Sequence, residues 1–208
     1  MDYYQQKERT EEFHIRQEKQ NGLNDAAEYY TDRAITLAGM AASEIEIRSM
    51  GPHDWVEVRR IYLEGIATGN ATFETEAPSW EKWDSTHSPH SRLTACDGAK
   101  VVGWAALSPV SARRVYAGAA EVSVYVAETV RGKGLGRQLL SALVDSSERQ
   151  GIWTLQAGIF PENLASITLH KSFGFRELGR RERIGKMGDR WRDVVLLERR
   201  SKIVGVHA

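Results

Sequence analysis

The fold is decided by residues 121–151, EVSVYVAETVRGKGLGRQLLSALVDSSERQG, where an apolar strand-like run passes through a glycine-rich turn into an amphipathic helix. Glycines and basic residues alternate at the turn, namely Arg131, Gly132, Lys133, Gly134, Gly136 and Arg137. Glycine lets an anion approach the bare N–H groups of a helix start, where the helix dipole is positive. The turn therefore fits a phosphate site, although the pattern alone fits a simple turn equally well.

Two familiar phosphate loops are excluded at this position. In the dinucleotide-binding pattern G-x-G-x-x-G, the third glycine would fall on Arg137 or Leu139. The P-loop requires a Gly-Lys pair followed by Ser or Thr, and the chain has no such run. What remains is R-G-x-G-x-G after an apolar strand.

Composition limits the possible classes of protein. A chain of 208 residues forms one full core and leaves little room for a second domain. The formal net charge is zero, so no overall field favours nucleic acid or membrane, although basic residues gather in 176–202. Cys96 is the only cysteine, which excludes an internal disulfide and a cysteine-built metal site. No apolar run spans a bilayer and the N-terminus lacks a signal-peptide pattern, so we expect a cytoplasmic protein.

The chain divides near residue 43. Residues 1–43 are polar with mixed charge, which predicts an N-terminal extension that is helical or disordered. Residues 44–202 alternate between strand-like and helix-like periodicity in the order β-α-α-β-β-β-α-β-α-β-β. This order predicts one mixed α/β domain.

Two segments together resemble a known family. Residues 131–136 match R/Q-x-x-G-x-G/A, the acetyl-CoA pyrophosphate loop of the GNAT family of N-acetyltransferases. The same family carries a downstream segment like N-x-x-A-x-x-L-Y-x-x-x-G-F. The corresponding residues here are Asn163, Ser166, Leu169, His170, Gly174 and Phe175. The two segments stand at the family's spacing, and the order of elements over 44–199 agrees with it.

The resemblance implies a fold and a co-substrate. The fold is a mixed, mostly antiparallel central sheet whose middle strands splay apart, flanked by helices. The co-substrate is acetyl-CoA, with its pyrophosphate in the glycine turn and its pantetheine arm along the cofactor strand. The implied contacts are Ser123, Val124, Tyr125, Val126, Arg131, Gly132, Lys133, Gly134, Leu135, Gly136, Arg137, Asn163 and Ser166.

One departure indicates a branch of the family. His170 stands where many members have a tyrosine acid, and Glu121 begins the cofactor strand. Both features, with the segments NATFETEAP (70–78), SARRVYAGAAEVSVYV (111–126) and KMGDRWRDVVLLER (186–199), resemble the phosphinothricin and methionine sulfone/sulfoximine acetyltransferases. This implies acetyl transfer to the α-amine of a small amino acid or analogue. It also implies a homodimer, with Trp191 able to line a neighbouring subunit's pocket.

The reaction requires proton transfers. An α-amine has a reference pKa of about 7.7–8.0, so it must lose a proton before it attacks a thioester. The resemblance places Glu121 as the base, directly or through water, unless Glu121 merely pairs with Arg113 or Arg114. It places His170 as the acid that protonates the leaving thiolate, unless His170 is a core-edge histidine.

The resemblance also implies a substrate site. Its residues are Phe73, Thr75, Glu76, Arg113 and Tyr116. An arginine such as Arg113 binds both oxygens of a carboxylate or phosphinate, whereas the loop aromatics also suit simple lid packing. We expect no metal, because His53, His87 and His90 lack ligand spacing and the mechanism needs none.

Alternative functions stay open at this point. An enzyme with the same co-substrate could act on a protein N-terminus, a lysine or a polyamine, although Arg113 and Arg114 favour a compact anionic substrate. A catalytically silent acyl-CoA-binding module is another class, and the presence of Glu121 and His170 speaks against it. The sequence does not name the amine, the oligomeric state or the role of residues 1–43.

Overall fold

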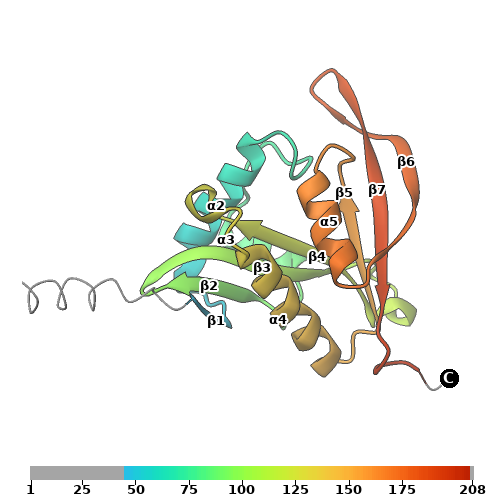
Figure 1. Ribbon diagram of the computed structural model, residues 1–208, viewed down its shortest axis with the longest axis horizontal. Coiled ribbons are helices and arrows are strands. Elements are labelled where there is room, and N and C mark those ends of the chain that lie inside the picture. Colours follow the sequence, from blue (N-terminus) through green and yellow to red (C-terminus); the bar gives the residue numbers. More distant parts are fainter. Residues whose placement is uncertain (1–44, 207–208) are drawn as a thin grey trace, which may run out of the picture. The chain divides into compact units, whose positions relative to one another are not determined.

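The computed structural model describes residues 45–206, so the predicted extension over 1–43 lies outside the described residues. The strands are β1 (Ile45–Ser49), β2 (Leu93–Asp97), β3 (Lys100–Pro109), β4 (Ala119–Val126), β5 (Thr154–Ile159), β6 (Arg176–Met187) and β7 (Arg190–Arg200). The α-helices are α2 (Trp55–Ala67), α3 (Trp80–Thr86), α4 (Leu135–Arg149) and α5 (Leu164–Ser172) (Figure 1). Their order is the one predicted from periodicity.

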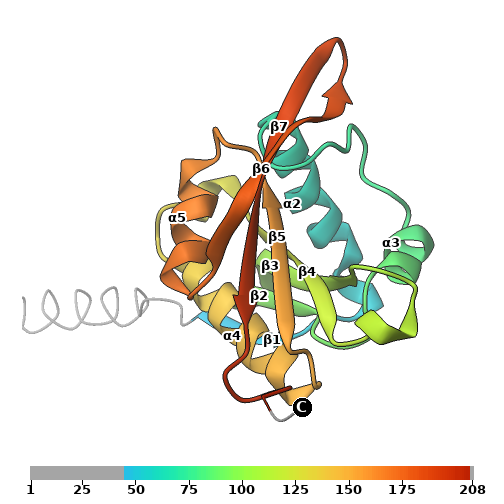
Figure 2. The ribbon, with the colours of Figure 1, turned by 90° about the vertical axis from the view of Figure 1, so that its right-hand side faces the viewer.

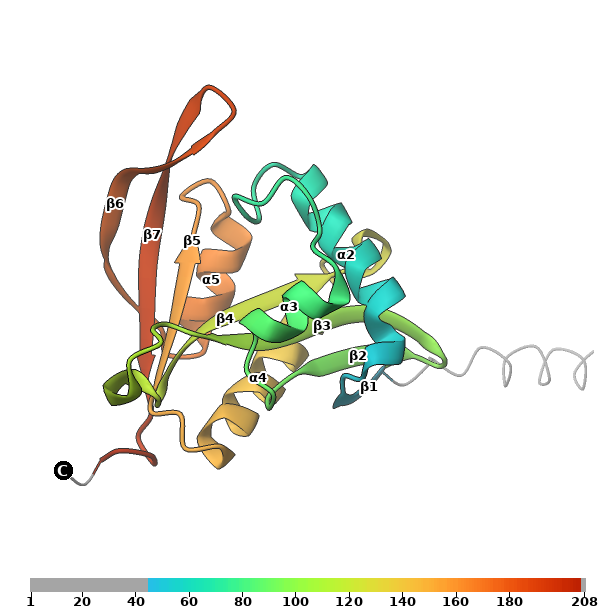
Figure 3. The ribbon, with the colours of Figure 1, turned by 180° about the vertical axis from the view of Figure 1, so that it is seen from behind.

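The strands form one sheet in the order β1-β2-β3-β4-β5-β7-β6. All neighbours are antiparallel except β4 and β5, which are parallel. These two pair only from Ala119↔Thr154 to Glu121↔Gln156. Beyond that point β4 continues along β3 as far as Val126, whereas β5 continues along β7 (Figure 3). The predicted splay of the two middle strands in a mostly antiparallel sheet is confirmed.

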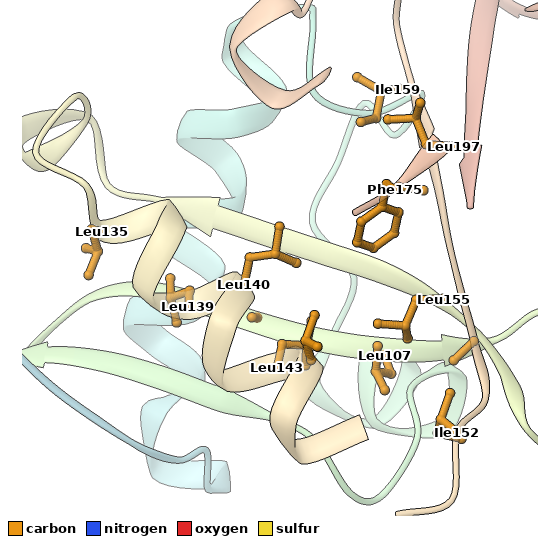
Figure 4. Close-up of a cluster of buried hydrophobic side chains, with 14 of the residues drawn as sticks. Leu107, Leu135, Leu139, Leu140, Leu143, Ile152, Leu155, Ile159, Phe175 and Leu197 are labelled. Atoms are coloured by element: carbon orange, nitrogen blue, oxygen red, sulfur yellow. The ribbon is translucent and has the colours of Figure 1, made fainter. Parts of the chain in front are cut away.

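Helix α4 covers one face of the sheet. Its buried residues recur three to five positions apart, which makes one apolar stripe: Leu135, Leu139, Leu140, Leu143 and Val144. The stripe packs against Leu107 of β3, Leu155 of β5 and Leu197 of β7 (Figure 4). The helix that follows the glycine turn is thereby fixed to the three strands on which the site is built.

Helices α2 and α3 cover the opposite face. Successive side chains of a strand point to opposite faces, and in β3 Ala105 and Leu107 join the α4 cluster while Trp104 and Ala106 join a second one. That second cluster includes Val58 and Ile61 of α2 and Trp83 of α3. Tyr125 of β4 packs on the same side, with its ring stacked on Trp104 at 4.6 Å.

The C-terminal hairpin of β6 and β7 closes one edge of the sheet and reaches beyond the other strands (Figures 1 and 2). Its register is irregular, because Arg181 pairs with Val194 whereas the next pair is Gly185 with Arg192. Two extra residues therefore lie in a bulge of β6. This bulge changes which side chains of β6 between Arg181 and Gly185 face the interior of the splay.

We predict that Leu139→Ala lowers the free energy of unfolding by about 2–5 kcal/mol, because it leaves a cavity between α4 and β3. Leu139 is fully buried and contacts Gly103, where an added Cβ would lie 2.9 Å from its Cδ1. Urea denaturation measures the change. Val56→Ala is the matched control, since Val56 is 75% exposed on α2 and its loss changes stability by less than about 0.5 kcal/mol. Equal effects of the two variants would contradict the assigned core.

Candidate active site

The site begins where β4 and β5 part. Glu121 belongs to the last residue pair that joins the two strands, so its carboxylate stands at the vertex of the splay. From Val122 onward, within the described residues, the edge of β4 that faces β5 has no strand partner. Residues 121, 123 and 125 alternate onto the face that α2 covers. Two cavities lie along this opening.

The first cavity, of about 390 Å³, lies beside the glycine turn. It is lined by most of the residues predicted to contact the cofactor: Val124, Tyr125, Val126, Arg131, Gly132, Gly134, Leu135, Gly136, Asn163 and Ser166. Lys133 and Arg137 are outside this lining, and Ser123 lines the second cavity instead. Arg137 joins helices α4 and α5, because its guanidinium lies 5.2 Å above the Phe173 ring and donates to the Ser172 hydroxyl.

The glycine turn has the shape of an anion site. Gly132 and Gly134 have φ of +77° and +84°, and a Cβ built at either position would meet nothing within 4 Å. Gly134 is the N-cap of α4 and provides no side-chain hydrogen bond to the first turn of the helix. Bare N–H groups and a positive helix end thus face open space, which fits a diphosphate.

The second cavity, of about 490 Å³, lies between β4, β5, the hairpin and the loop after α2. Its polar lining includes Thr72, Glu74, Glu121, Ser123, Gln156 and Arg181. Phe73 also lines it, with its ring 4.8 Å from that of Phe160 in an edge-to-face contact. This cavity could hold the acceptor of the reaction.

The two cavities share a wall. The residues common to both linings are Asn70, Ala71, Val124, Tyr125, Asn163, Ser166 and His170. The side chain of Asn163 joins two parts of this wall, since its oxygen caps α5 by accepting from Ser166 N and its amide donates to Asn70 O at 3.1 Å. The two cavities therefore adjoin each other along these residues.

His170 lies in the shared wall and is 4% exposed. Its Nδ1 is 2.8 Å from the Ser166 carbonyl oxygen, which only accepts, so Nδ1 carries the proton. Its Nε2 is buried and has no hydrogen-bond partner among the described residues. Burial lowers the pKa of His170, and the Ser166 carbonyl only partly offsets this. The resting imidazole is therefore neutral, with a free lone pair on Nε2.

Two opposing effects act on the pKa of the Glu121 carboxyl group. Loss of hydration within the surrounding protein raises this pKa, and the positive charge of Arg181 partly opposes the rise. Its Oε1 lies 3.7 Å from the position that a Cβ on Gly158 would take, so the missing side chain of Gly158 leaves room for the carboxylate. Among the ion pairs of residues 45–206, none joins Glu121 to Arg113 or Arg114.

A buried arginine fixes the loop between the cavities. Arg192 of β7 is 6% exposed and donates to Gly69 O at 2.8 Å and to Asn70 Oδ1 at 3.1 Å. It also pairs with Glu162, and its guanidinium lies 3.9 Å above the Phe160 ring. The sequence did not indicate this role, because nothing near Arg192 in the chain marks it as buried.

Other residues predicted for the substrate lie elsewhere in this structure. Thr75 and Glu76 line neither cavity, and neither do Arg113 and Tyr116. Arg113 and Tyr116 lie in the exposed link before β4, next to the 3₁₀ turn η2 (Arg114–Tyr116), with the guanidinium 5.5 Å from the ring. Their roles in substrate binding stay predictions. Arg181 is the arginine that lines the acceptor cavity, and the sequence drew attention only to its basic segment.

Within residues 45–206, no helix has the length and apolar character needed to cross a bilayer. In the same range, no three His, Cys, Asp or Glu side chains gather as a metal ion would require.

Known proteins are similar to this chain in sequence and in fold. The model of the acetyltransferase (GNAT) family matches residues 55–175, more than half of the chain. The phosphinothricin N-acetyltransferase of Streptomyces coelicolor is 31% identical over 165 residues, 76% of this chain and 96% of the relative. The L-methionine sulfoximine/L-methionine sulfone acetyltransferase of Pseudomonas aeruginosa is 32% identical over 158 residues, 73% of this chain and 92% of the relative.

A solved structure gives the same result for the fold. It is the GNAT superfamily phosphinothricin acetyltransferase of Sinorhizobium meliloti in complex with acetyl-CoA, with a TM-score of 0.68 and 28% identity. The match covers 75% of this chain and 88% of that one. The splayed sheet, the glycine turn and the sequence match agree with one another. The chain belongs to the GNAT family of acetyltransferases.

Proposed function

We propose that this protein transfers the acetyl group of acetyl-CoA to the α-amine of a small amino acid or analogue of the phosphinothricin or methionine sulfone/sulfoximine type. The observation that carries the proposal is the position of Glu121. It lies at the vertex of the splay, in the lining of an acceptor cavity that meets the glycine-turn cavity at His170. The names of the relatives support the same chemistry and the same class of substrate.

The chain's own residues account for binding of acetyl-CoA, which supplies a thioester-activated acetyl group. The N–H groups of the turn around Gly132 and Gly134 suit the diphosphate, with Arg131 beside them. The free edge of β4 over residues 123–126 suits an extended amide-bearing arm, because its backbone groups on that side lack a strand partner among the described residues. Asn163 and Ser166 complete the wall.

Glu121 acts as the base in this mechanism. The amine arrives largely as an ammonium and must lose a proton before it attacks. The raised pKa of Glu121 strengthens it as a base, and the positive charge of Arg181 favours the ionised carboxylate that accepts the proton. The proton passes to Glu121 directly or through a water molecule.

His170 transfers the second proton of the amine to the leaving thiolate. The amine gives up one proton before attack and another as the amide forms, and the leaving thiolate must gain one. Because Nε2 carries a lone pair at rest, His170 can donate to the thiolate only after it has accepted a proton. We assign the second amine proton to Nε2, which then passes it to the thiolate.

The size of the acceptor cavity favours a small molecule. A volume of about 490 Å³ lies within the range of small-molecule sites, roughly 300–1,000 Å³. An acetyltransferase that modifies a protein N-terminus or a lysine needs a surface for the surrounding chain. Phe73 lines the cavity, which supports its predicted contact with the substrate. For Thr75, Glu76, Arg113 and Tyr116, contact with the substrate stays a prediction from the sequence.

We also propose that the protein works as a homodimer in the cytoplasm, where acetyl-CoA is available. Support for the homodimer comes from the β6–β7 hairpin, on which Leu178, Ile184 and Trp191 are exposed at 41%, 44% and 56%. Large exposed apolar side chains on a projecting hairpin are suited to contact a second copy. No nucleic acid or membrane partner is proposed.

The glycine turn can be tested by charge alone. Gly134→Asp should abolish the thermal protection given by acetyl-CoA, because it places a carboxylate in the open space where the diphosphate is proposed to bind. Gly134→Asn is the matched control, since Asn has the same shape, tolerates positive φ and carries no charge. Thermal shift with and without acetyl-CoA measures both. Full protection of the Asp variant would contradict the assignment of the turn.

The base can be tested by its pH dependence. Glu121→Gln keeps the shape but cannot accept the proton, so kcat should fall by about 10²-fold or more at pH 7. The loss should shrink as pH rises, because more of the amine is already neutral. Release of free CoA thiol measures turnover across the pH range. His170→Ala serves as the comparison and should cost less, because a thiolate leaves without protonation at high pH; full activity of Glu121→Gln at pH 7 would refute its role.

The homodimer can be tested at the hairpin. Trp191→Glu should shift the protein from dimer to monomer in sedimentation velocity, because burying a carboxylate in an apolar contact is costly. Ile203→Glu is the control, since Ile203 is also exposed, at 73%, but lies beyond the hairpin in the C-terminal segment. A dimer that survives Trp191→Glu unchanged would place the contact elsewhere.

A further inference from the structure

Arg181 lines the acceptor cavity together with Glu121. Its positive charge opposes the rise in the pKa of the Glu121 carboxyl group. The ion pairs of residues 45–206 include none between these two side chains. By contrast, the adjacent Arg180 is paired with Asp193 at 2.6 Å. A negative and a positive group thus line one cavity without forming an ion pair with each other.

The register of β6 directs Arg181 inward, because Arg181 is paired with Val194, which lines the same cavity. In a regular strand, Arg181 and Ile184 would point to opposite faces, because they are three residues apart. Here both line the acceptor cavity, since the two extra residues of the bulge lie between Arg181↔Val194 and Gly185↔Arg192. Figures 1 and 3 show β6 curving away from the straighter β7.

Asp193 holds the bulge in place. One of its carboxylate oxygens accepts from Arg183 N at 2.7 Å, and the other accepts from Arg180 Nε at 2.7 Å. Arg183 has φ of +49°, a left-handed conformation that a non-glycine residue adopts at a cost of about 1–3 kcal/mol. A strained residue whose N–H is bound by Asp193, next to an Arg180 side chain bound by the same carboxylate, indicates a defined bulge rather than a frayed strand.

An α-amino acid matches this charge arrangement. Its ammonium and its carboxylate are bonded to the same carbon atom, so a site for one must place the other within a few ångströms. The ammonium belongs at Glu121 if Glu121 is the base. We propose that Arg181 binds the α-carboxylate of the acceptor, so that Glu121 and Arg181 together select a zwitterionic amino acid over a simple amine. This inference rests on the proposed function.

The geometry of arginine suits this role. A guanidinium presents two parallel N–H donors to both oxygens of a carboxylate, and such charge-assisted pairs are about twice as strong as neutral ones.

The test compares two acceptors that differ only in the carboxylate. The first is the amino acid that the wild type acetylates best in a panel with methionine sulfone, methionine sulfoximine and phosphinothricin. The second is the corresponding amine without the α-carboxyl group, such as 3-(methylsulfonyl)propylamine for methionine sulfone. In Arg181→Gln, kcat/KM for the amino acid should fall by about 10- to 100-fold, mainly through KM, because one charged hydrogen-bonding partner is lost. For the decarboxylated amine, kcat/KM should stay within about threefold.

Two controls make the result specific. Arg183→Gln removes the same charge from the same bulge, and because Arg183 does not line the cavity it should leave both acceptors unaffected. Arg181→Lys keeps a positive charge and should recover part of the amino-acid activity. Thermal protection by acetyl-CoA should equal that of the wild type in all three variants, which shows that the fold and the cofactor site are intact.

The outcomes separate this inference from the proposed function. If Arg181→Gln acetylates the amino acid as well as the wild type does, or loses both acceptors equally, the carboxylate assignment is overturned while the proposed function stands. If the wild type acetylates no amino acid of the panel, both are overturned.

Discussion

The parting of β4 from β5 after Glu121 is the constraint on which the rest of the structure depends. Two parallel strands that stop pairing leave a row of backbone groups without partners, and such groups must find a ligand or water. The sheet tolerates this because β4 remains paired with β3 through Val126 and β5 remains paired with β7. The packing of α4 against β3, β5 and β7 holds the two halves together beneath the opening. The strands therefore part within one packed sheet, and the glycine turn and the start of α5 stand on either side of the opening.

The loop that follows α2 needs support of its own, since it forms part of both cavities without belonging to the sheet. Arg192 provides this support from β7, with hydrogen bonds to Gly69 and Asn70 and stacking on Phe160. A buried guanidinium is stable only when it is paired and hydrogen-bonded, and Glu162 supplies the opposite charge. The contact joins residues 123 positions apart in sequence. The position of the loop is thus set by β7, the same strand that carries Asp193.

Sequence patterns predicted the parts of the site that depend on neighbouring residues. The apolar stripe of α4, the glycine turn before it and the Asn163 cap of α5 are all local, so periodicity and capping rules located them. The inward positions of Arg181 and Arg192 were not predicted. In a strand, the face that a residue occupies depends on the register with its partner, and in β6 the extra residue between Glu177↔Leu197 and Gly179↔Leu196 shifts that register. The basic segment 176–202 was visible in the sequence, but which of its arginines are buried depends on contacts with distant loops.

Packing against two other aromatic rings holds Tyr125, which lines both cavities, in position. Tyr125 stacks on Trp104 at 4.6 Å and meets Tyr62 edge-on at 5.0 Å, while Tyr62 meets Trp104 at 5.8 Å. Gly65 lies directly behind Tyr125, where even one added carbon would come within 2.7 Å of the ring. Each aromatic pair contributes about 0.5–1.5 kcal/mol, so displacing Tyr125 disrupts two pairs at once. Ring packing in the core consequently fixes the position of Tyr125, and with it the surface that this residue presents to both cavities.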